Sequence, residues 1–298
     1  QRFLPLMPVA FESFDMTAYD IILSSSSCCA KGVITGPGAI HICYCHTPMR
    51  YAWEFFGEYT EDMKPLKRKI IGLLMNYIRI WDAISANRVD YFIANSNNVA
   101  KRIWKHYRRK ATVIYPPIDT EYFTPGREDG DFYLCVSRLV KYKRIDLAVQ
   151  ACNRLKASLV VIGQGAEYER LKKMAGATLK ILGRQPDDVI REYYRRCKAF
   201  IFPGEEDFGM TPLEAQACGR PVIAYGKGGA LETVIDGKTG IFFEEQTVES
   251  LIQGMKKLDG IKIEKSACRE NAERFSVQTF KENLREEIER RCRDADIL

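Results

Sequence analysis

Short apolar runs of strand type alternate with amphipathic stretches of helical type from Tyr19 to the end of this chain. Such alternation is typical of parallel sheets with helices on both faces, so we predict an α/β fold. Ten strands would divide naturally into two sheets. The predicted strands are Asp20–Ser24, Ile40–Cys45, Tyr91–Asn95, Thr112–Tyr115, Phe132–Val136, Ser158–Ile162, Leu179–Leu182, Ala199–Phe202, Pro221–Tyr225 and Gly240–Phe243.

The size of the chain and one proline pair predict how it divides. At 298 residues and 46% hydrophobic content, the chain can form two domains of ordinary size. Pro116 and Pro117 forbid continuation of a central strand, because proline lacks the backbone donor of the sheet ladder. We therefore predict one domain at 1–115, a second at 116–275 and a terminal helix within 276–298.

One segment combines a strand end, a loop and a helix start. Glu206 and Glu214 flank seven residues in it, and Gly209 allows the backbone to approach a ligand closely. Pro212 suits the first turn of a helix from Met210 to Cys218, and backbone N–H groups at such a helix start remain unpaired. The segment therefore predicts a ligand site at the positive end of this helix. The alternative is that both glutamates are solvated surface acids.

Two cations follow the predicted strand Phe132–Val136. Arg138 and Lys143 would lie at the carboxyl edge of a parallel sheet, where ligands of this architecture bind. Arginine grips phosphate oxygens with two donors and lysine supplies a mobile point charge. This pair predicts an anion site, whereas the alternative is an exposed pair on an ordinary loop.

Four motifs in combination carry a family resemblance. They are the glutamate pair Glu206 and Glu214, the run Ser137-Arg138-Leu139 with Lys143, the run His46-Thr47-Pro48-Met49-Arg50, and Ala94-Asn95-Ser96. With them, the chain from Tyr19 to Phe275 resembles the retaining nucleotide-sugar glycosyltransferases of family 4. The sequences of these motifs are most similar to those of mannosyltransferase-like members that build bacterial or archaeal surface polysaccharides. The resemblance implies a GT-B fold of two Rossmann-like, doubly wound domains.

The resemblance also implies roles for individual residues. Arg138 and Lys143 would bind the diphosphate, and Glu214 would accept hydrogen bonds from the ribose hydroxyls. The side chain of Glu206 would contact the hydroxyls of the transferred sugar, together with backbone N–H groups that come from Phe208, Gly209 and Met210. His46 would contact the donor sugar near the reacting centre, and Arg50 would add charge on the acceptor side.

The reaction implied is transfer of a hexose, most readily mannose, to a glycan or a lipid-linked acceptor with retention of configuration. GDP-mannose is the favoured donor, a UDP-sugar is the alternative, and no cofactor or metal is expected. In this family the first domain opens with a glycine-rich loop, which the sequence lacks, so we expect that domain to be incomplete. The competing hypothesis is a non-catalytic nucleotide-sugar-binding fragment, or a subunit that a partner completes. The last helix, Ser276–Arg291, would cross back to the first domain or stay on the second.

Charge and cysteines limit the remaining classes. A net charge of +6 suits anionic ligands but is too small to predict nucleic-acid binding. The 10 cysteines form no Cys-x-x-Cys pair and lie mostly in apolar runs, which indicates free thiols in a reducing cytoplasm. Cys43 and Cys45 share a strand face from which His46 points away, so we predict no metal site. The sequence contains no run of 18 apolar residues, so we predict no membrane span.

Two basic amphipathic stretches have two interpretations each. Lys64–Trp81 places Leu66, Ile70, Leu73, Leu74, Tyr77 and Trp81 along one side. Asn98–Lys110 places Val99, Ile103 and Tyr107 on one stripe. The first interpretation is a helix packed on the core through these residues. The second is a surface helix that contacts anionic lipid at the inner face of a membrane.

Overall fold

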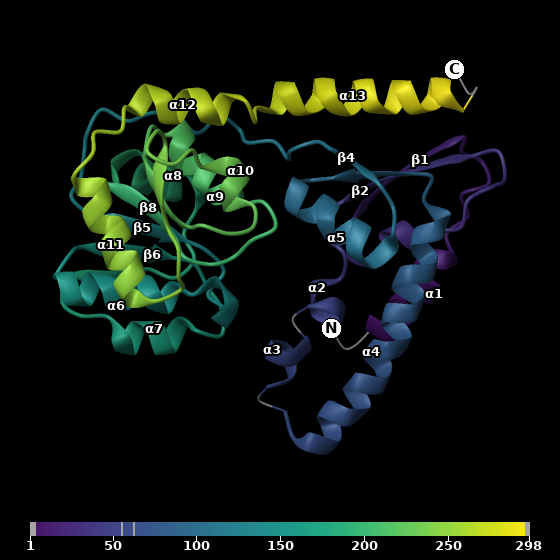
Figure 1. The fold of residues 1–298 in the computed structure, drawn as a ribbon, viewed down its shortest axis with the longest axis horizontal. Coiled ribbons are helices and arrows are strands. Elements are labelled where there is room, and N and C mark those ends of the chain that lie inside the picture. Colours follow the sequence, from purple (N-terminus) through teal and green to yellow (C-terminus); the bar gives the residue numbers. More distant parts are fainter. Residues whose placement is uncertain (1–3, 55, 62, 296–298) are drawn as a thin grey trace. The chain divides into compact units, whose positions relative to one another are not determined.

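The computed structural model describes residues 4–54, 56–61 and 63–295, which form two compact units (Figure 1). The first unit contains Gln1–Tyr115 and Lys281–Leu298, and the second unit contains Pro116–Phe280. The division between Tyr115 and Pro116 falls at the proline pair. Each unit has its own parallel sheet.

The first unit has a four-stranded sheet in the order β1-β2-β3-β4. Its strands are β1 (Ile21–Ser26), β2 (Ile40–Cys45), β3 (Tyr91–Ala94) and β4 (Ala111–Val113), and all neighbours are parallel. β2 is buried along its whole length, as a central strand of a covered sheet should be. β1 alternates between exposed and buried residues, so Ile21 and Leu23 face outward at this edge of the sheet.

Short helices and one long helix surround this sheet. The helical segments before β3 are η1 (Leu4–Leu6), α1 (Met7–Glu12), η2 (Ala30–Gly32), α2 (Arg50–Trp53), α3 (Phe56–Thr60), α4 (Pro65–Ser85) and η3 (Ala86–Arg88). α5 (Asn97–Tyr107) follows β3, and α13 (Val277–Asp294) joins the first unit from Lys281 onward. In that part of α13, buried Glu287 accepts a hydrogen bond from Thr112 Oγ1 at 2.9 Å.

The second unit has a six-stranded parallel sheet in the order β10-β9-β8-β5-β6-β7. The strands are β5 (Tyr133–Val136), β6 (Leu159–Ile162), β7 (Leu179–Ile181), β8 (Ala199–Phe202), β9 (Val222–Tyr225) and β10 (Gly240–Phe243). The connecting helices are η4 (Lys141–Lys143), α6 (Ile145–Leu155), α7 (Tyr168–Met174), α8 (Asp187–Arg196), α9 (Met210–Ala217), α10 (Ala230–Thr233), α11 (Val248–Asp259) and α12 (Lys265–Glu273).

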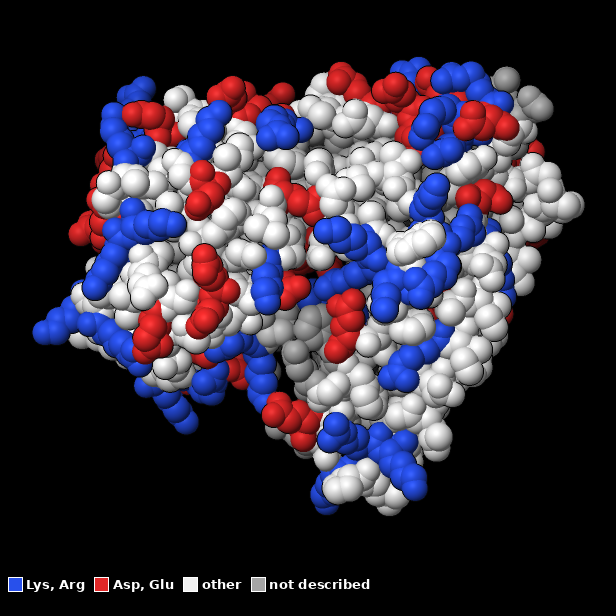
Figure 2. All heavy atoms as spheres, in the orientation of Figure 1, with Lys and Arg blue, Asp and Glu red and all other residues white. Residues whose placement is uncertain are grey.

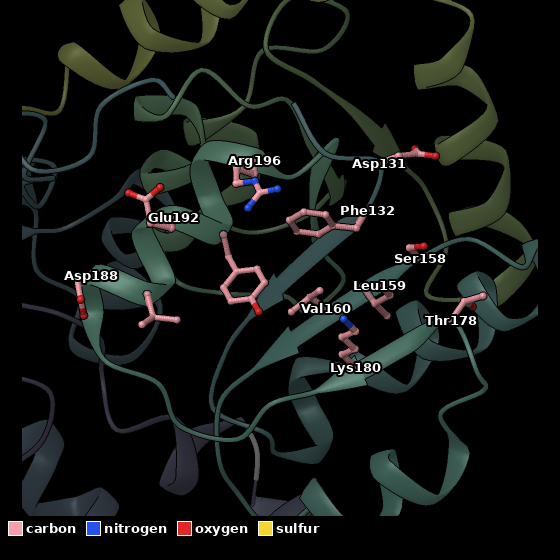
Figure 3. A pocket seen from close by; sticks show the side chains of 12 residues that line it. Asp131, Phe132, Ser158, Leu159, Val160, Thr178, Lys180, Asp188, Glu192 and Arg196 are labelled. Atoms are coloured by element: carbon pink, nitrogen blue, oxygen red, sulfur yellow. The ribbon is translucent and has the colours of Figure 1, made fainter. Parts of the chain in front are cut away.

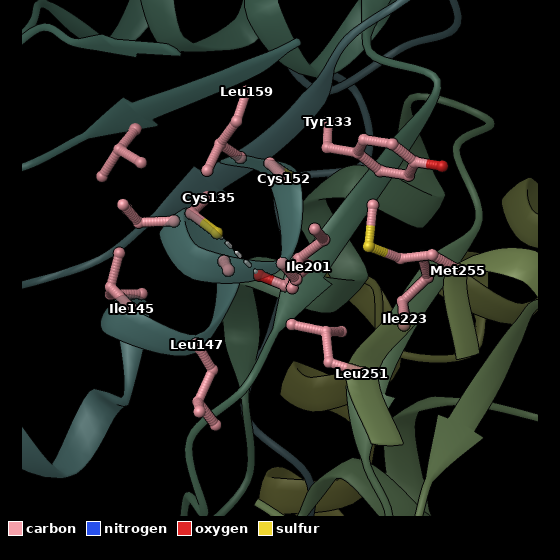
Figure 4. Packing of buried hydrophobic residues seen from close by; sticks show 14 of the residues in the cluster. Tyr133, Cys135, Ile145, Leu147, Cys152, Leu159, Ile201, Ile223, Leu251 and Met255 are labelled. Carbon is pink, nitrogen blue, oxygen red and sulfur yellow. Dashed lines mark hydrogen bonds between the residues drawn. The ribbon is translucent and has the colours of Figure 1, made fainter. Parts of the chain in front are cut away.

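Helices cover both faces of this sheet, because alternate residues of each strand enter two different cores. On one face Cys135, Ile201 and Ile223 pack with residues of α6 and α11 (Figure 4). On the other face Leu134 and Phe200 pack with residues of α8, α9 and α10. The unit is therefore doubly wound, and the prediction of two Rossmann-like α/β domains is confirmed.

All ten predicted strands are present, each within two residues of its predicted ends. Local pattern was sufficient here because parallel strands covered on both faces are continuous apolar runs with polar flanks. The helix predicted from Met210 to Cys218 is α9, and the last helix is α13.

The two amphipathic helices differ in how they pack. In α5 the predicted stripe of Val99, Ile103 and Tyr107 is buried, so core packing is confirmed for this helix. In α4 the core-packing interpretation is wrong for the predicted stripe, of which only Trp81 is buried. α4 instead packs through its opposite side, with Met75 and Ile78 inward. The helix has apolar residues on both sides, and its periodicity does not reveal which side meets the core.

Candidate functional site

The candidate site lies where the strand order of the second sheet reverses. β5 is followed in sequence by β6 on one side, whereas β8 lies on its other side. The loops after β5 and β8 therefore diverge at the carboxyl edge of the sheet and leave a crevice there, the usual ligand position in open α/β sheets. Arg138 and Lys143 follow β5, while Glu206 and Glu214 follow β8.

The structure brings Lys143 and Glu206 into direct contact. Lys143 Nζ lies 2.5 Å from Glu206 Oε1, and the two side chains are only 19% and 14% exposed. A charge-assisted contact of this length fixes both groups in a partly desolvated position. Lys143, which belongs to the motif with Ser137-Arg138-Leu139, and Glu206, which belongs to the glutamate pair, therefore form one site.

The loop that carries Glu206 is held from behind by a close backbone contact. Gly229 donates its N–H to the Glu206 carbonyl oxygen at 2.8 Å. A Cβ atom at Gly229 would lie 2.2 Å from Phe208 Cα, so only glycine permits this approach. The contact gives the loop after β8 a defined course toward α9.

α9 begins at the predicted position, with Gly209 as its N-cap residue. Gly209 has φ of +97°, which favours glycine, and no side chain caps the helix start. The Phe208 ring is buried and contacts the Phe275 ring, whereas Met210 is exposed. Phe208 and Gly209 thus shape the loop, and the first N–H groups of α9 are not used by a capping side chain.

Glu214 lies one turn into α9 and is oriented by a residue that the sequence did not single out. The hydroxyl of Tyr194, a buried residue of α8, donates to Glu214 Oε2 at 2.8 Å. Burial raises the pKa of Glu214, and the Tyr194 hydrogen bond opposes part of that rise. Among the described residues, none donates a hydrogen bond to Oε1, so this oxygen can accept from a ligand. The role of Tyr194 could not be predicted from the sequence, because Tyr194 resembles any other apolar residue of α8.

Arg138 differs from Lys143 in its surroundings. It is exposed, and its guanidinium makes no ion pair or hydrogen bond with any residue in the described part of the chain. Arg138 lies in the loop between β5 and η4, whereas Lys143 is the last residue of η4, and no contact links the two side chains. The structure therefore offers one fixed cation and one unpaired cation at the same sheet edge.

His46 belongs to the first unit, at the carboxyl end of β2. Its Nε2 lies 2.8 Å from Ser25 Oγ at the end of β1, and its ring packs edge-on against Tyr44. Burial lowers the pKa of His46, which favours the neutral imidazole. Ser25 is a second residue that the sequence did not identify. Because His46 and Glu206 belong to different units, the expectation that both side chains contact the same donor sugar stays a prediction.

The rest of the His46 motif is braced by α5. Arg102 Nη2 lies 2.8 Å from Glu54 Oε2, and Arg102 Nη1 lies 3.5 Å from Thr47 Oγ1. Arg50, the last residue of the motif, begins α2 and is partly buried. Arg50 and Arg102 therefore place positive charge at the loop after β2, and the acceptor-side role of Arg50 stays a prediction.

A separate hollow of about 570 Å³ lies at the opposite, amino edge of the second sheet (Figure 3). Phe132, Ser158 and Thr178, which immediately precede β5, β6 and β7, line it together with residues of α8. None of the predicted site residues lines this hollow. It is therefore distinct from the site at the carboxyl edge.

Two parallel Rossmann-like units, one with a cation and carboxylate site at its switch point, define a GT-B architecture, and solved structures agree. Sucrose-phosphate synthase from Thermosynechococcus elongatus matches with a TM-score of 0.74 at 18% identity, over 93% of this chain and 75% of that chain. Anabaena HepE, crystallised in complex with UDP, matches with a TM-score of 0.61 at 18% identity, over 84% of this chain and 78% of that chain.

The chain belongs to the family of glycosyl transferases group 1, whose model matches residues 118–275, more than half of its length. The model of glycosyltransferase family 4 matches residues 2–122, in agreement with the resemblance seen in the motifs.

Curated relatives are similar over part of their length. An uncharacterized glycosyltransferase of Methanocaldococcus jannaschii, MJ1178, is 28% identical over 63% of this chain and 54% of its own. A GDP-mannose-dependent alpha-(1-6)-phosphatidylinositol monomannoside mannosyltransferase of Mycolicibacterium smegmatis is 30% identical over 46% of this chain and 44% of its own. The chain thus spans about half the length of these curated relatives.

Proposed function

We propose that the protein is a retaining glycosyltransferase that moves a hexose from a nucleotide diphosphate sugar to a glycan or lipid-linked acceptor. The observation that carries the proposal is the contact between Lys143 and Glu206 at the switch point of the second sheet. It places a cation suited to a diphosphate beside a carboxylate suited to sugar hydroxyls. Family membership supports the same reaction class.

The donor would bind through groups that the second unit supplies. Its diphosphate would pair with Lys143 and with Arg138, whose guanidinium has no partner among the described residues. The start of α9 adds backbone donors and the positive end of a helix dipole. Glu214 would accept the ribose hydroxyls through Oε1, while Tyr194 holds Oε2.

The chemistry follows from where charge develops. As the bond between the anomeric carbon and the diphosphate oxygen breaks, negative charge grows on the leaving diphosphate and is stabilised by Arg138 and Lys143. The acceptor hydroxyl forms the new bond on the same face of the sugar. Its proton passes to the departing phosphate oxygen, as the family resemblance implies. His46, kept neutral by burial and held by Ser25, would contact the donor sugar near the reacting carbon.

Mannose is the favoured sugar and GDP-mannose the favoured donor. The sequences of the motifs and the similarity to the GDP-mannose-dependent mannosyltransferase of Mycolicibacterium smegmatis support this choice. A UDP-sugar is the alternative, supported by the HepE structure with UDP. Two cations and a helix start would neutralise the diphosphate, so we propose that transfer needs no metal. The described cysteines form no disulfide, which suits a reducing cytoplasm.

A second hypothesis is a nucleotide-sugar binder without transfer activity. Its support is that the groups proposed for the donor, Lys143, Glu206 and Glu214, are binding groups and include no dedicated nucleophile. Both hypotheses require the donor site in the second unit. They differ only in whether donor binding leads to a product.

Calorimetry with GDP-mannose, UDP-glucose and ADP-glucose tests the site that the two hypotheses share. Lys143→Ala removes a hydrogen bond to a charged group worth about 1.5–3 kcal/mol, so we expect donor affinity to fall about 10- to 100-fold. Lys173→Ala, on the exposed side of α7, is the matched control and should bind normally. Equal affinities for the two variants would remove the basis of the proposal.

Transfer itself is tested by incubation with a polyprenyl-linked glycan and the donor that binds. A product with the donor's anomeric configuration, formed equally with and without EDTA, is the expected result. Donor binding without product would favour the non-catalytic hypothesis. An inverted product would contradict the retaining mechanism.

A further inference from the structure

The outward side of α4 carries a continuous apolar stripe in the first unit. Each member is between 49% and 73% exposed, although all six are large hydrophobic residues. The members of this α4 stripe are Leu66, Ile70, Leu73, Tyr77, Ile80 and Ile84. Exposed apolar patches of this extent mark interaction sites on folded proteins.

The spacing of the α4 stripe makes it straight and narrow. Its members follow one another at intervals of four and three residues, so at 100° per residue they stay within an arc of about 80°. From Leu66 to Ile84 the stripe is about 27 Å long. The inward side, with Met75, Ile78 and Asp82 buried, lies nearly opposite. The stripe is therefore the face of α4 that points away from its own core.

The inward side of α4 is fixed, which keeps the stripe turned outward. Asp82 of α4 accepts hydrogen bonds from Lys31 at 2.7 Å, Trp53 at 2.7 Å and Tyr107 at 2.8 Å. Rotation of the helix to bury the stripe would expose this carboxylate and break all three contacts. The exposure of the stripe is thus a consequence of a satisfied buried network, which leaves the stripe available for an interaction.

Charge indicates what kind of surface would cover the stripe. From Met63 to Trp81 the sequence contains no acidic residue, whereas Lys64, Lys67, Arg68 and Lys69 gather where α4 begins. Figure 2 shows Lys and Arg side chains clustered at the lower tip of the first unit, where α4 begins in Figure 1. Positive charge at the positive end of a helix dipole is unfavourable without an anionic partner. The covering surface should therefore be negatively charged.

A second copy of the chain fits this surface poorly. In a paired helix the positions beside the seam would be Lys67, Leu74 and Trp81 on one side, and Lys69, Asn76 and Ala83 on the other. In a parallel pair Lys69 would face Leu74 of the partner, and an antiparallel pair would offer no acid to either lysine. The flanks lack the opposite charges that stabilise such pairs.

We infer that the α4 stripe and its basic start form a docking surface for an anionic lipid bilayer. Apolar side chains would enter the acyl boundary while the lysines and Arg68 contact anionic headgroups. The helix would lie in the plane of the bilayer. In the described part of the chain no helix is long and apolar enough to cross a membrane. The docking stands on its own geometry, and only its use for a lipid-linked acceptor rests on the proposed function.

Vesicle flotation tests the docking directly with the whole protein. We expect binding to phosphatidylcholine vesicles that contain phosphatidylglycerol, and weak binding to phosphatidylcholine alone. Leu73→Glu/Ile80→Glu places two charges in the acyl boundary and should abolish flotation. The matched control is Leu155→Glu/Ile261→Glu, which alters two exposed apolar residues of the second unit and should float like the wild type.

A second variant tests the charge separately. Each lysine or arginine near an anionic surface contributes about fivefold to partitioning, so Lys67→Gln/Arg68→Gln/Lys69→Gln should weaken binding on the order of 100-fold. Its control is Lys172→Gln/Lys173→Gln/Lys256→Gln, three exposed lysines of the second unit. Circular dichroism and donor affinity should be unchanged in all four variants, which separates failed docking from a failed donor site.

Three results would overturn the inference. The first is that the wild type does not float with phosphatidylglycerol vesicles. The second is that Leu73→Glu/Ile80→Glu floats as well as its control. The third is a wild-type dimer in sedimentation that Leu73→Glu/Ile80→Glu dissolves, which would assign the α4 stripe to a second copy.

Discussion

The buried ion pair between Lys31 and Asp82 offers a stability prediction whose size follows from the structure. Lys31 is 1% exposed and Asp82 is 0% exposed, and Lys31 also donates to Ser85 Oγ at 2.8 Å. The ammonium group lies over the rings of Trp81 and Tyr107, at 5.0 and 5.2 Å from their centroids. Asp82 is therefore the counter-ion of a buried ammonium group whose other contacts are neutral.

Asp82→Ala would leave the Lys31 ammonium buried without its counter-ion and would free the donors of Trp53 and Tyr107. Loss of one partner of a buried pair costs about 3–5 kcal/mol, a large share of the roughly 5–15 kcal/mol that stabilises a domain. With a urea m value of about 2 kcal/mol/M, the midpoint of the first unit should fall by about 2 M.

Intrinsic fluorescence measures this unit selectively. The protein has 3 tryptophans, Trp53, Trp81 and Trp104, and all belong to the first unit. Urea titration followed at the tryptophan emission therefore reports the first unit even when the second unfolds separately. Circular dichroism of the same samples follows both units.

The matched variant is Lys31→Met/Asp82→Asn, which removes both charges and leaves an acceptor for Trp53 and Tyr107. Because paired burial of two charges adds little net stability, this double variant should lie within about 1.5 kcal/mol of the wild type. A loss below about 1 kcal/mol for Asp82→Ala would refute the reasoning. So would a double variant as unstable as the single one.

Three further predictions concern the site. Burial raises the pKa of Glu214 above its ordinary 4.5, so on acidification the carboxylate needed for ribose binding is protonated at a higher pH than usual. Calorimetry at a series of pH values should show donor affinity falling as Glu214 is protonated. Glu214→Gln should not show this fall. The same shift makes the Glu214 contribution to folding stability largest at low pH and removes it as pH rises through the raised pKa. Gly229→Ala would drive a Cβ atom into Phe208 at 2.2 Å, so thermal unfolding should show a loss of about 1–3 kcal/mol, and an unchanged melting temperature would contradict the close contact. Ser25→Ala frees the His46 ring, so kcat should fall about tenfold at unchanged donor affinity, whereas a loss confined to KM would argue against a positioning role.

Much of the fold could be predicted from local pattern. The strand ends and the start of α9 emerged because apolar runs, proline and glycine act through the backbone of their own segment. The position of the candidate site could then be predicted from the strands, since loops after parallel strands share the carboxyl edge of a sheet. Lys143 and Glu206 meet there, as strands β5 and β8 require.

The orientation of α4 was not predictable in the same way. Its sequence has apolar residues on two sides, and periodicity only reports that such sides exist. Which side turns inward depends on Lys31, Trp53 and Tyr107, the donors that reach Asp82 from other elements. Because the side of α4 that carries Asp82 is buried, the α4 stripe is exposed.

The sequence by itself determined two parallel sheets, the loops at their carboxyl edges and the residue types that those loops carry. These features arise within single segments, where backbone geometry and apolar period act over a few residues. Tertiary structure alone decided that Ser25 meets His46 across 21 positions, Tyr194 meets Glu214 across 20, and Lys31 meets Asp82 across 51. Such contacts depend on burial and distance in the folded chain, and no local pattern encodes either.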